Sequence, residues 1–151
     1  MLIMTRKMDL DGLVEKVRGK RVGIWTCRTC ARLCDGLGGD EAAERLESAL
    51  EERGIEVCGR ASTSASCLWD KVERALADDP FRDAEVIIPL TCDVAAKMME
   101  SFSDALAVDC VLTRGRGGLS EEKEPLLMGP DGSWTRLGDL EDAQDLRGPF
   151  V

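Results

Sequence analysis

Arg21-Val-Gly-Ile-Trp-Thr-Cys-Arg-Thr-Cys-Ala-Arg-Leu-Cys34 is the stretch of the chain that decides the fold. Its start, up to Trp25, is a short and mostly apolar segment that predicts a β-strand. Cysteines follow with the spacing C-x2-C-x3-C, and then Asp35-Gly-Leu-Gly-Gly39 gives the backbone the freedom of a loop. A strand that leads into a cysteine-rich loop indicates a binding site at one edge of a sheet.

Strand and helix patterns alternate along the rest of the chain. The apolar periodicity predicts helices over Asp11–Arg18, Asp40–Arg53, Cys67–Ala77 and Cys92–Phe102. Strands are predicted over Arg21–Trp25, Ile55–Ala61, Ala84–Leu90 and Asp109–Thr113. We therefore expect an α/β fold, with a small Rossmann-like or flavodoxin-like parallel sheet of about four strands and flanking helices.

Two of these helices are short, and their apolar residues predict which side is buried. Leu68 and Val72 are expected to face the core from the helix that Cys67 opens, and Val94 and Ala95 from the helix that Cys92 opens.

The last part of the chain differs in kind. Pro125–Leu137 predicts a hairpin around a Pro-Asp-Gly turn, and an acidic tail runs from Asp139 to Val151. We expect residues 1–118 to form the α/β domain that carries the site, with 119–151 packed on it as a hairpin and tail.

Composition and charge narrow the classes of function. The chain has 151 residues, enough for one domain with its own core, and a formal net charge of −9. This charge repels phosphate backbones, so nucleic acid is not an expected partner. No apolar run approaches the roughly 20 residues that span a bilayer, and Met1–Lys7 lacks the apolar region of a signal peptide. We expect a cytoplasmic protein without a membrane span.

Cysteine usage points to metal or thiol chemistry. Seven cysteines are an odd number, and disulfides are rare in the reducing cytoplasm. The chain has no histidine and no tyrosine, which excludes His-ligated zinc, Rieske clusters and Ser–His or Cys–His catalysis. No phosphate-loop signature is present either. A bound metal would have to be held by thiolates.

Five of the cysteines are expected at one edge of the sheet. Cys27, Cys30 and Cys34 follow the first strand, Cys67 follows the second and Cys92 the third. Because ligands of open parallel sheets bind beyond the carboxyl ends of the strands, these five predict one metal site. Cys67 and Cys92 also open predicted helices, where the helix dipole would lower the thiol pKa.

Other residues have weaker predicted roles at this edge. Cys58 and Cys110 lie within predicted strands and are expected to be small core residues. Arg114 and Arg116, in the Gly-rich segment Arg114–Gly118, can bind an anionic ligand or offset the charge of a thiolate cluster. Hydroxyl groups that can either cap helices or donate hydrogen bonds to cluster sulfur are those of Thr26, Ser64, Ser66 and Thr91.

Several segments together carry a family resemblance. They are Cys27-Arg-Thr-Cys-Ala-Arg-Leu-Cys34 with Gly38-Gly39, the acidic helix Asp40–Arg53 with the Gly-Ile-Glu-Val strand after it, Cys67, and Leu90-Thr-Cys-Asp-Val-Ala-Ala96. In these segments, which span 21–114, the chain resembles the N-terminal domain of the small iron–sulfur partner subunit of anaerobic methylenetetrahydrofolate reductase, a methylenetetrahydrofolate reductase C-terminal-type domain.

The resemblance implies an α/β domain with a cysteine-bound metal centre that transfers electrons beside a flavoprotein reductase in one-carbon metabolism. The chain departs from the family because no cysteine follows Cys110, so the later cysteine-rich segment of the full subunit is missing. We therefore expect a stand-alone version of the domain.

Three interpretations stay open. The favoured one is a [4Fe–4S] protein that is accessory to an oxidoreductase and has no catalytic residue of its own. The same cysteines could instead hold zinc in a structural or regulatory site, or Cys27 and Cys30 could act as a metal-free redox pair. Either metal site needs four thiolates, which leaves one of the five cysteines over, and Cys34 is the weakest candidate ligand.

Overall fold

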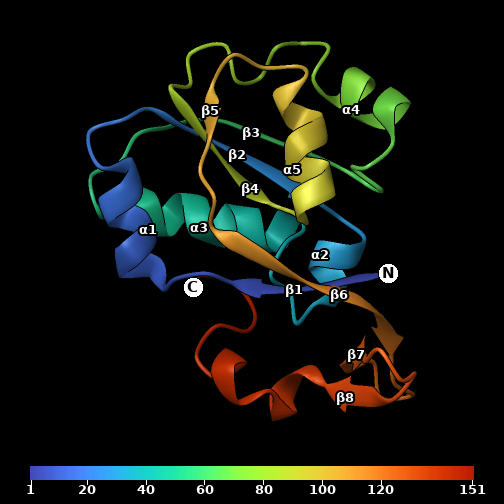
Figure 1. Ribbon diagram of the computed structural model, residues 1–151. Coiled ribbons are helices and arrows are strands. Elements are labelled where there is room, and N and C mark those ends of the chain that lie inside the picture. The colour runs from blue at the N-terminus through green and yellow to red at the C-terminus, as the bar shows by residue number, and fades with distance from the viewer.

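A four-stranded parallel sheet forms the centre of the computed structural model, which describes residues 1–151 (Figure 1). Its strands are β2 (Val22–Cys27), β3 (Val57–Thr63), β4 (Val86–Leu90) and β5 (Leu106–Ala107), in the order β3-β2-β4-β5. All neighbours in this sheet are parallel, so the predicted α/β fold is confirmed. The order places the first strand of the sheet between the second and third, as in flavodoxin-like folds.

Helices cover both faces of this sheet. On one face, α1 (Leu10–Val17) and α3 (Asp40–Glu52) pack against Ile24 and Ile88 in the main core. On the other, α4 (Trp69–Ala75) and α5 (Asp93–Glu100) pack against Trp25 and Ile87 in a second, smaller core. Ile24 and Trp25 are neighbours in β2 that serve opposite cores, because successive strand residues point to opposite faces. A single helical turn, α2 (Cys30–Leu33), follows β2.

A second, antiparallel sheet lies beside this layer. Its strands are β1 (Leu2–Arg6), β6 (Val111–Leu119), β7 (Pro125–Met128) and β8 (Trp134–Arg136), in that order. The predicted hairpin is confirmed as the β7–β8 pair. The prediction of a parallel strand over Asp109–Thr113 followed by a loop was wrong, because residues 111–119 form one strand paired with β1.

A β-bulge interrupts the pairing of β1 with β6. Ile3 lies opposite Gly115 and Met4 opposite Thr113, so the β6 strand carries one extra residue. Gly115 has φ of 149°, a backbone conformation that favours glycine. The bulge changes the direction in which the following side chains of β6 point.

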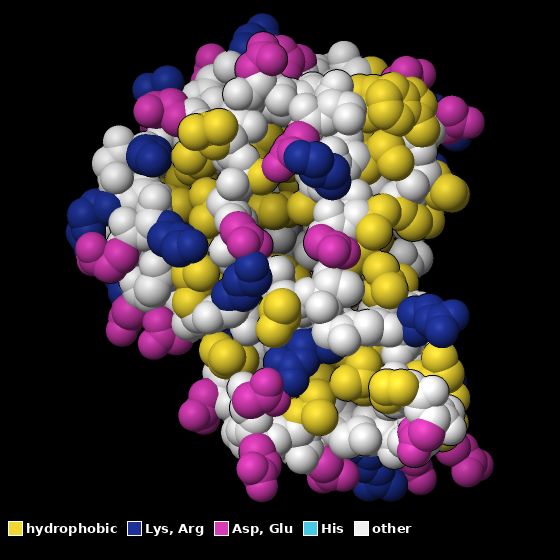
Figure 2. Space-filling view, viewed as in Figure 1, with side chains coloured by type: hydrophobic (Ala, Val, Ile, Leu, Met, Phe, Trp, Pro, Cys, Tyr) yellow, Lys and Arg dark blue, Asp and Glu magenta, His cyan; other side chains and the backbone are white.

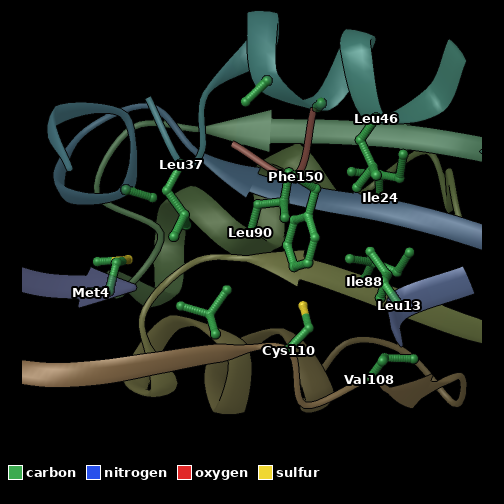
Figure 3. Packing of buried hydrophobic residues seen from close by; sticks show 14 of the residues in the cluster. Met4, Leu13, Ile24, Leu37, Leu46, Ile88, Leu90, Val108, Cys110 and Phe150 are labelled. Carbon is green, nitrogen blue, oxygen red and sulfur yellow. The ribbon is translucent and has the colours of Figure 1, made fainter. Parts of the chain in front are cut away.

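The C-terminal segment closes the main core. After β8 it passes through two short 3-10 turns, η1 (Leu137–Asp139) and η2 (Glu141–Ala143). Leu137 and Phe150 are buried in the main core, where Phe150 lies among Ile24, Ile88 and Leu90 (Figure 3). Residues 119–151 therefore share a sheet and a core with the rest of the chain.

Three details of the helices differ from the prediction. Helix α4 begins at Trp69 instead of Cys67, and Leu68 is its N-cap and 51% exposed. Val94 is 50% exposed, because Met99 and Ala95 are the buried residues of α5.

No helix combines the length and the apolar composition that crossing a membrane requires.

Candidate metal centre

Three parallel strands end side by side at the edge that carries the cysteines. Thr26 of β2 pairs with Leu90 of β4, and Cys27 pairs with Thr63 of β3. The loops that follow these strands therefore start next to one another, although they are far apart in sequence.

Four of the predicted cysteines line one pocket of about 270 Å³ at this edge: Cys27, Cys30, Cys67 and Cys92. The rest of the lining is mostly apolar and consists of Met1, Leu2, Thr29, Ala31, Ala65, Ser66, Ala95 and Arg116. Met1 and Leu2 belong to the N-terminal segment, which the sequence did not indicate as part of the site.

Each of the four cysteines comes from a different local structure. Cys27 is the last residue of β2 and Cys30 the first of α2. Cys67 lies in the turn between β3 and α4 and is the exposed member of the set. Cys92 is the buried N-cap of α5. The site thus depends on the ends of three strands and cannot be assembled from the C-x2-C segment alone.

Cys27 has the most favourable surroundings for a thiolate. Burial raises its pKa, but the hydroxyl and amide groups of Ser66 and Thr29 outweigh burial, so the pKa lies below that of an ordinary thiol. Thr29 Oγ1 is 3.0 Å from Cys27 Sγ and accepts a hydrogen bond from the amide of Ala65 at 3.1 Å, which leaves its own hydrogen free for the sulfur. The role of Thr29, inside the C-x2-C segment, was not predicted.

The predicted lowering of the thiol pKa at a helix N-terminus was wrong for Cys92. Burial raises the pKa of Cys92 more than the amides of Ala95 and Val94 at the start of α5 lower it. Cys67 lies two residues before Trp69, where α4 begins, and therefore does not cap that helix.

Cys34, the fifth predicted ligand, does not line the pocket. It leaves α2 as its C-cap, is fully buried in the main core, and its thiol donates to the carbonyl of Leu2 at 3.5 Å. Burial raises the pKa of Cys34 to about 11, which keeps the thiol protonated. Cys30 and Cys34 are four residues apart, but they do not share a helical face because α2 ends before a second turn can form.

The two other cysteines lie elsewhere. Cys110 is fully buried, as expected of a core residue, and burial raises its pKa to about 12. Cys58 is only half-buried, so its assignment to the core was wrong; it lies on β3, a strand at the edge of the sheet. Its thiol is 3.5 Å from the carbonyl of Val22.

Among the predicted polar residues, Ser66 is distinctive. Its hydroxyl is fully buried beside the pocket, where it lies close enough to Cys27 to lower the pKa of that thiol but forms no hydrogen bond of good geometry within the protein. Thr26 binds Leu90 and Gly39, Thr91 binds Cys92, and Ser64 accepts a hydrogen bond from Lys71, so these three hydroxyls are engaged in holding the local backbone and side chains.

The two arginines are separated by the fold. Arg116 lines the cysteine pocket, whereas Arg114 is bound to the carboxylate of Asp142 at 2.7 and 2.9 Å. The structure therefore places only Arg116 of this pair at the cysteine pocket.

The thiols surround the pocket without converging on one point. As the side chains stand, no three cysteine, aspartate or glutamate residues are close enough together to hold a metal ion. A scan against protein-family models, a search of curated proteins and a search of solved structures gave no match.

Proposed function

We propose that the protein is a [4Fe–4S] electron-transfer protein, accessory to an oxidoreductase, with Cys27, Cys30, Cys67 and Cys92 as ligands. The observation that carries the proposal is the placement of these four cysteines around one pocket, from the ends of three adjacent strands. Four thiolates are the ligand set of such a cluster, which would supply one-electron redox chemistry.

A four-iron cluster and a single zinc ion place different demands on the four thiols. Zinc needs four sulfurs about 2.3 Å from one point, and the thiols here do not converge in that way. A four-iron cluster takes one thiolate on each iron, so its ligands stand around a volume, as the four cysteines do around the pocket.

The remaining lining also fits a cluster. Most of it is apolar, which limits the access of water to a reactive iron–sulfur centre. The buried hydroxyl of Ser66 forms no hydrogen bond of good geometry within the protein, and a cluster sulfur or the Cys27 thiolate beside it would accept its hydrogen. Thr29 can donate to the sulfur of Cys27 in the same way.

The proposed setting is the cytoplasm, and the proposed partner is a flavoprotein reductase of one-carbon metabolism. All seven cysteines are free thiols, which fits a reducing compartment. The partner follows from the resemblance described above. Acidic and basic side chains are interspersed over the face seen in Figure 2, without a continuous basic surface, which supports a protein partner over nucleic acid.

The test is iron and sulfide content together with the visible spectrum of protein purified without oxygen. We expect about four irons and a broad thiolate-to-iron absorption band in the wild type. One zinc and no colour would favour the structural or regulatory alternative, and the absence of both metals would favour the redox pair of Cys27 and Cys30.

Two matched alanine variants test the ligand set. Cys67→Ala removes a pocket cysteine, and we expect it to lose the four-iron spectrum. Cys34→Ala removes a buried cysteine outside the pocket and should retain iron at the wild-type ratio. The opposite pattern, in which Cys34→Ala loses the cluster and Cys67→Ala keeps it, would overturn the assignment.

A further inference from the structure

Arg116 is the one side chain with a permanent charge among the residues that line the cysteine pocket. It is exposed, and it forms no ion pair and no side-chain hydrogen bond within the protein. Some arginines of this acidic chain, such as Arg53 and Arg60, are neutralised by carboxylates, whereas the charge of Arg116 is free to act on the pocket.

The bulge in β6 is what directs Arg116 to the pocket. Arg116 pairs with Leu2, which also lines the pocket, and paired residues of antiparallel strands share a face. In a regular strand Arg114 would point the same way, two residues earlier. The extra residue at the bulge sends Arg114 to the other face, where it meets Asp142.

The positive charge of Arg116 affects how readily the proposed centre is reduced. Four thiolates outweigh the positive charge of an iron–sulfur core, so the proposed centre is anionic and becomes more so when it is reduced. The protein itself is strongly acidic, with a net charge of −9, and disfavours added negative charge. A guanidinium at the pocket favours the reduced state, since its attraction for the centre grows with each electron added.

We propose that the positive charge of Arg116 raises the reduction potential of the centre held by the four pocket cysteines. This inference rests on the proposed function. Reduction adds one electron, supplied by dithionite in the test below, and no bond forms or breaks.

The test is a redox titration, with dithionite as the reductant, of the iron-loaded wild type, Arg116→Gln, Arg116→Lys and Arg114→Gln. At a fixed potential we expect Arg116→Gln to have about a two- to tenfold lower ratio of reduced to oxidised centre than the wild type. Arg116→Lys should stay near the wild type because it keeps the charge. Arg114→Gln removes an arginine from the same strand but the opposite face, and should also stay near the wild type.

Ionic strength provides a second readout in the same titration. Because Arg116 is exposed, the difference between the wild type and Arg116→Gln should shrink as salt is added. Iron-loaded Arg116→Gln that titrates like the wild type would overturn the inference and leave the proposed function intact. An equal change in Arg114→Gln would overturn it too, since it would indicate only the loss of a net charge.

A chemical probe tests the placement without iron. In reduced, iron-free protein we compare the alkylation rates of Cys67 by anionic iodoacetate and neutral iodoacetamide. A several-fold lower iodoacetate-to-iodoacetamide ratio in Arg116→Gln supports a positive charge at the thiols, and an unchanged ratio overturns it. Failure of the wild-type protein to bind iron would instead count against the proposed function. The failure of the proposed function and the failure of the Arg116 inference are therefore distinguishable.

Discussion

Thr29 connects the two loops that contribute most to the cysteine pocket. Its hydroxyl contacts the sulfur of Cys27 and accepts a hydrogen bond from the amide of Ala65, in the turn that leads to Cys67. Ala65 has a positive φ of 48°, which a non-glycine residue adopts only when its surroundings hold it there. A single side chain thus sets both a thiol's surroundings and the path of the neighbouring turn.

Replacing Thr29 with valine, which has the same shape but no hydroxyl, removes both contacts. We expect the pKa of Cys27 to rise in Thr29→Val, because burial still favours the neutral thiol and one donor to the thiolate is gone. Alkylation of Cys27 in reduced, iron-free protein at neutral pH should become several-fold slower, as measured by mass spectrometry. Thr135→Val, on exposed β8, is the matched control and should leave the rate unchanged.

Burial of the Cys110 thiol makes the stability of the iron-free protein fall as the pH rises into the alkaline range. Its pKa is about 12 in the folded protein, because of burial, against 9.0 for an ordinary thiol. Well below pH 9 the thiol is neutral in both states and its contribution to stability is complete. Between pH 9 and about 12 it ionises in the unfolded chain while the folded chain keeps it protonated, so stability falls with rising pH.

The variant Cys110→Ala isolates this contribution. Over the upper part of that range one such thiol lowers the free energy of unfolding by about 1.4 kcal/mol per pH unit. In the variant, the free energy of unfolding should therefore fall with pH less steeply than in the wild type, by the same amount, about 1.4 kcal/mol per pH unit. Urea unfolding at a series of pH values measures the slopes. Identical slopes in the variant and the wild type would mean that the thiol is not held neutral by the fold.

At the scale of elements, the loop between α2 and α3 is fixed by Gly38 and Thr26. The hydroxyl of Thr26 donates to the carbonyl of Leu90 at 3.1 Å and accepts from the amide of Gly39 at 2.7 Å, which ties β2, β4 and the loop together. A Cβ on Gly38 would lie 2.6 Å from Ala31 Cβ and 2.7 Å from the carbonyl oxygen of Leu90. The second contact is to backbone, which cannot move aside easily.

Gly38→Ala should therefore destabilise the protein by about 3 kcal/mol, as overpacking in a dense region does. Denaturant unfolding measures the change. The control is Gly118→Ala, where a Cβ meets nothing within 4 Å and the change should stay within about 0.5 kcal/mol. Equal effects of the two substitutions would show that the loop can shift away from β4.

Among the elements, β2 and β4 could be predicted from the sequence, whereas the pairing of β1 with β6 could not. β2 and β4 are continuous apolar runs followed by helix patterns, so local sequence was sufficient to identify them and the cysteines at their ends. β1 is a short run whose partner, β6, lies more than a hundred residues away, and local sequence carries no signal for such a pairing.

The glycines of β6 explain the error in the second half of the chain. Arg114–Gly118 has the composition of a loop, yet it lies within strand β6. Glycine is required at position 117 because a side chain there would overlap Ile3 and the carbonyl of Leu126. Glycine allows the close approach of β1 and β7 to β6. Because the bulge in β6 arises from this tertiary packing, the opposite directions of Arg114 and Arg116 could not be predicted either.

At the scale of the whole molecule, Arg6 joins the first strand to the last residues of the chain. Its guanidinium donates to the carbonyls of Met8, Asp145, Arg147 and Gly148 and lies 5.4 Å from the ring centre of Phe150. Phe150 in turn fills the main core beside the parallel sheet. One mostly buried cation therefore holds the tail over the core that supports the cysteine-bearing strands.

Arg6→Met tests this connection, because methionine keeps an apolar side chain but removes the donors. We expect a loss of about 2–4 kcal/mol of stability, since several carbonyls lose their partner in a partly buried region. The tail should also become sensitive to limited proteolysis near Arg147, while the thiols stay at the edge of the parallel sheet. Arg53→Met, which breaks an exposed ion pair with Asp11, should cost less than about 1 kcal/mol and leave the tail resistant. A tail that remains resistant in Arg6→Met would mean that burial of Phe150 alone holds it, with the guanidinium contributing little.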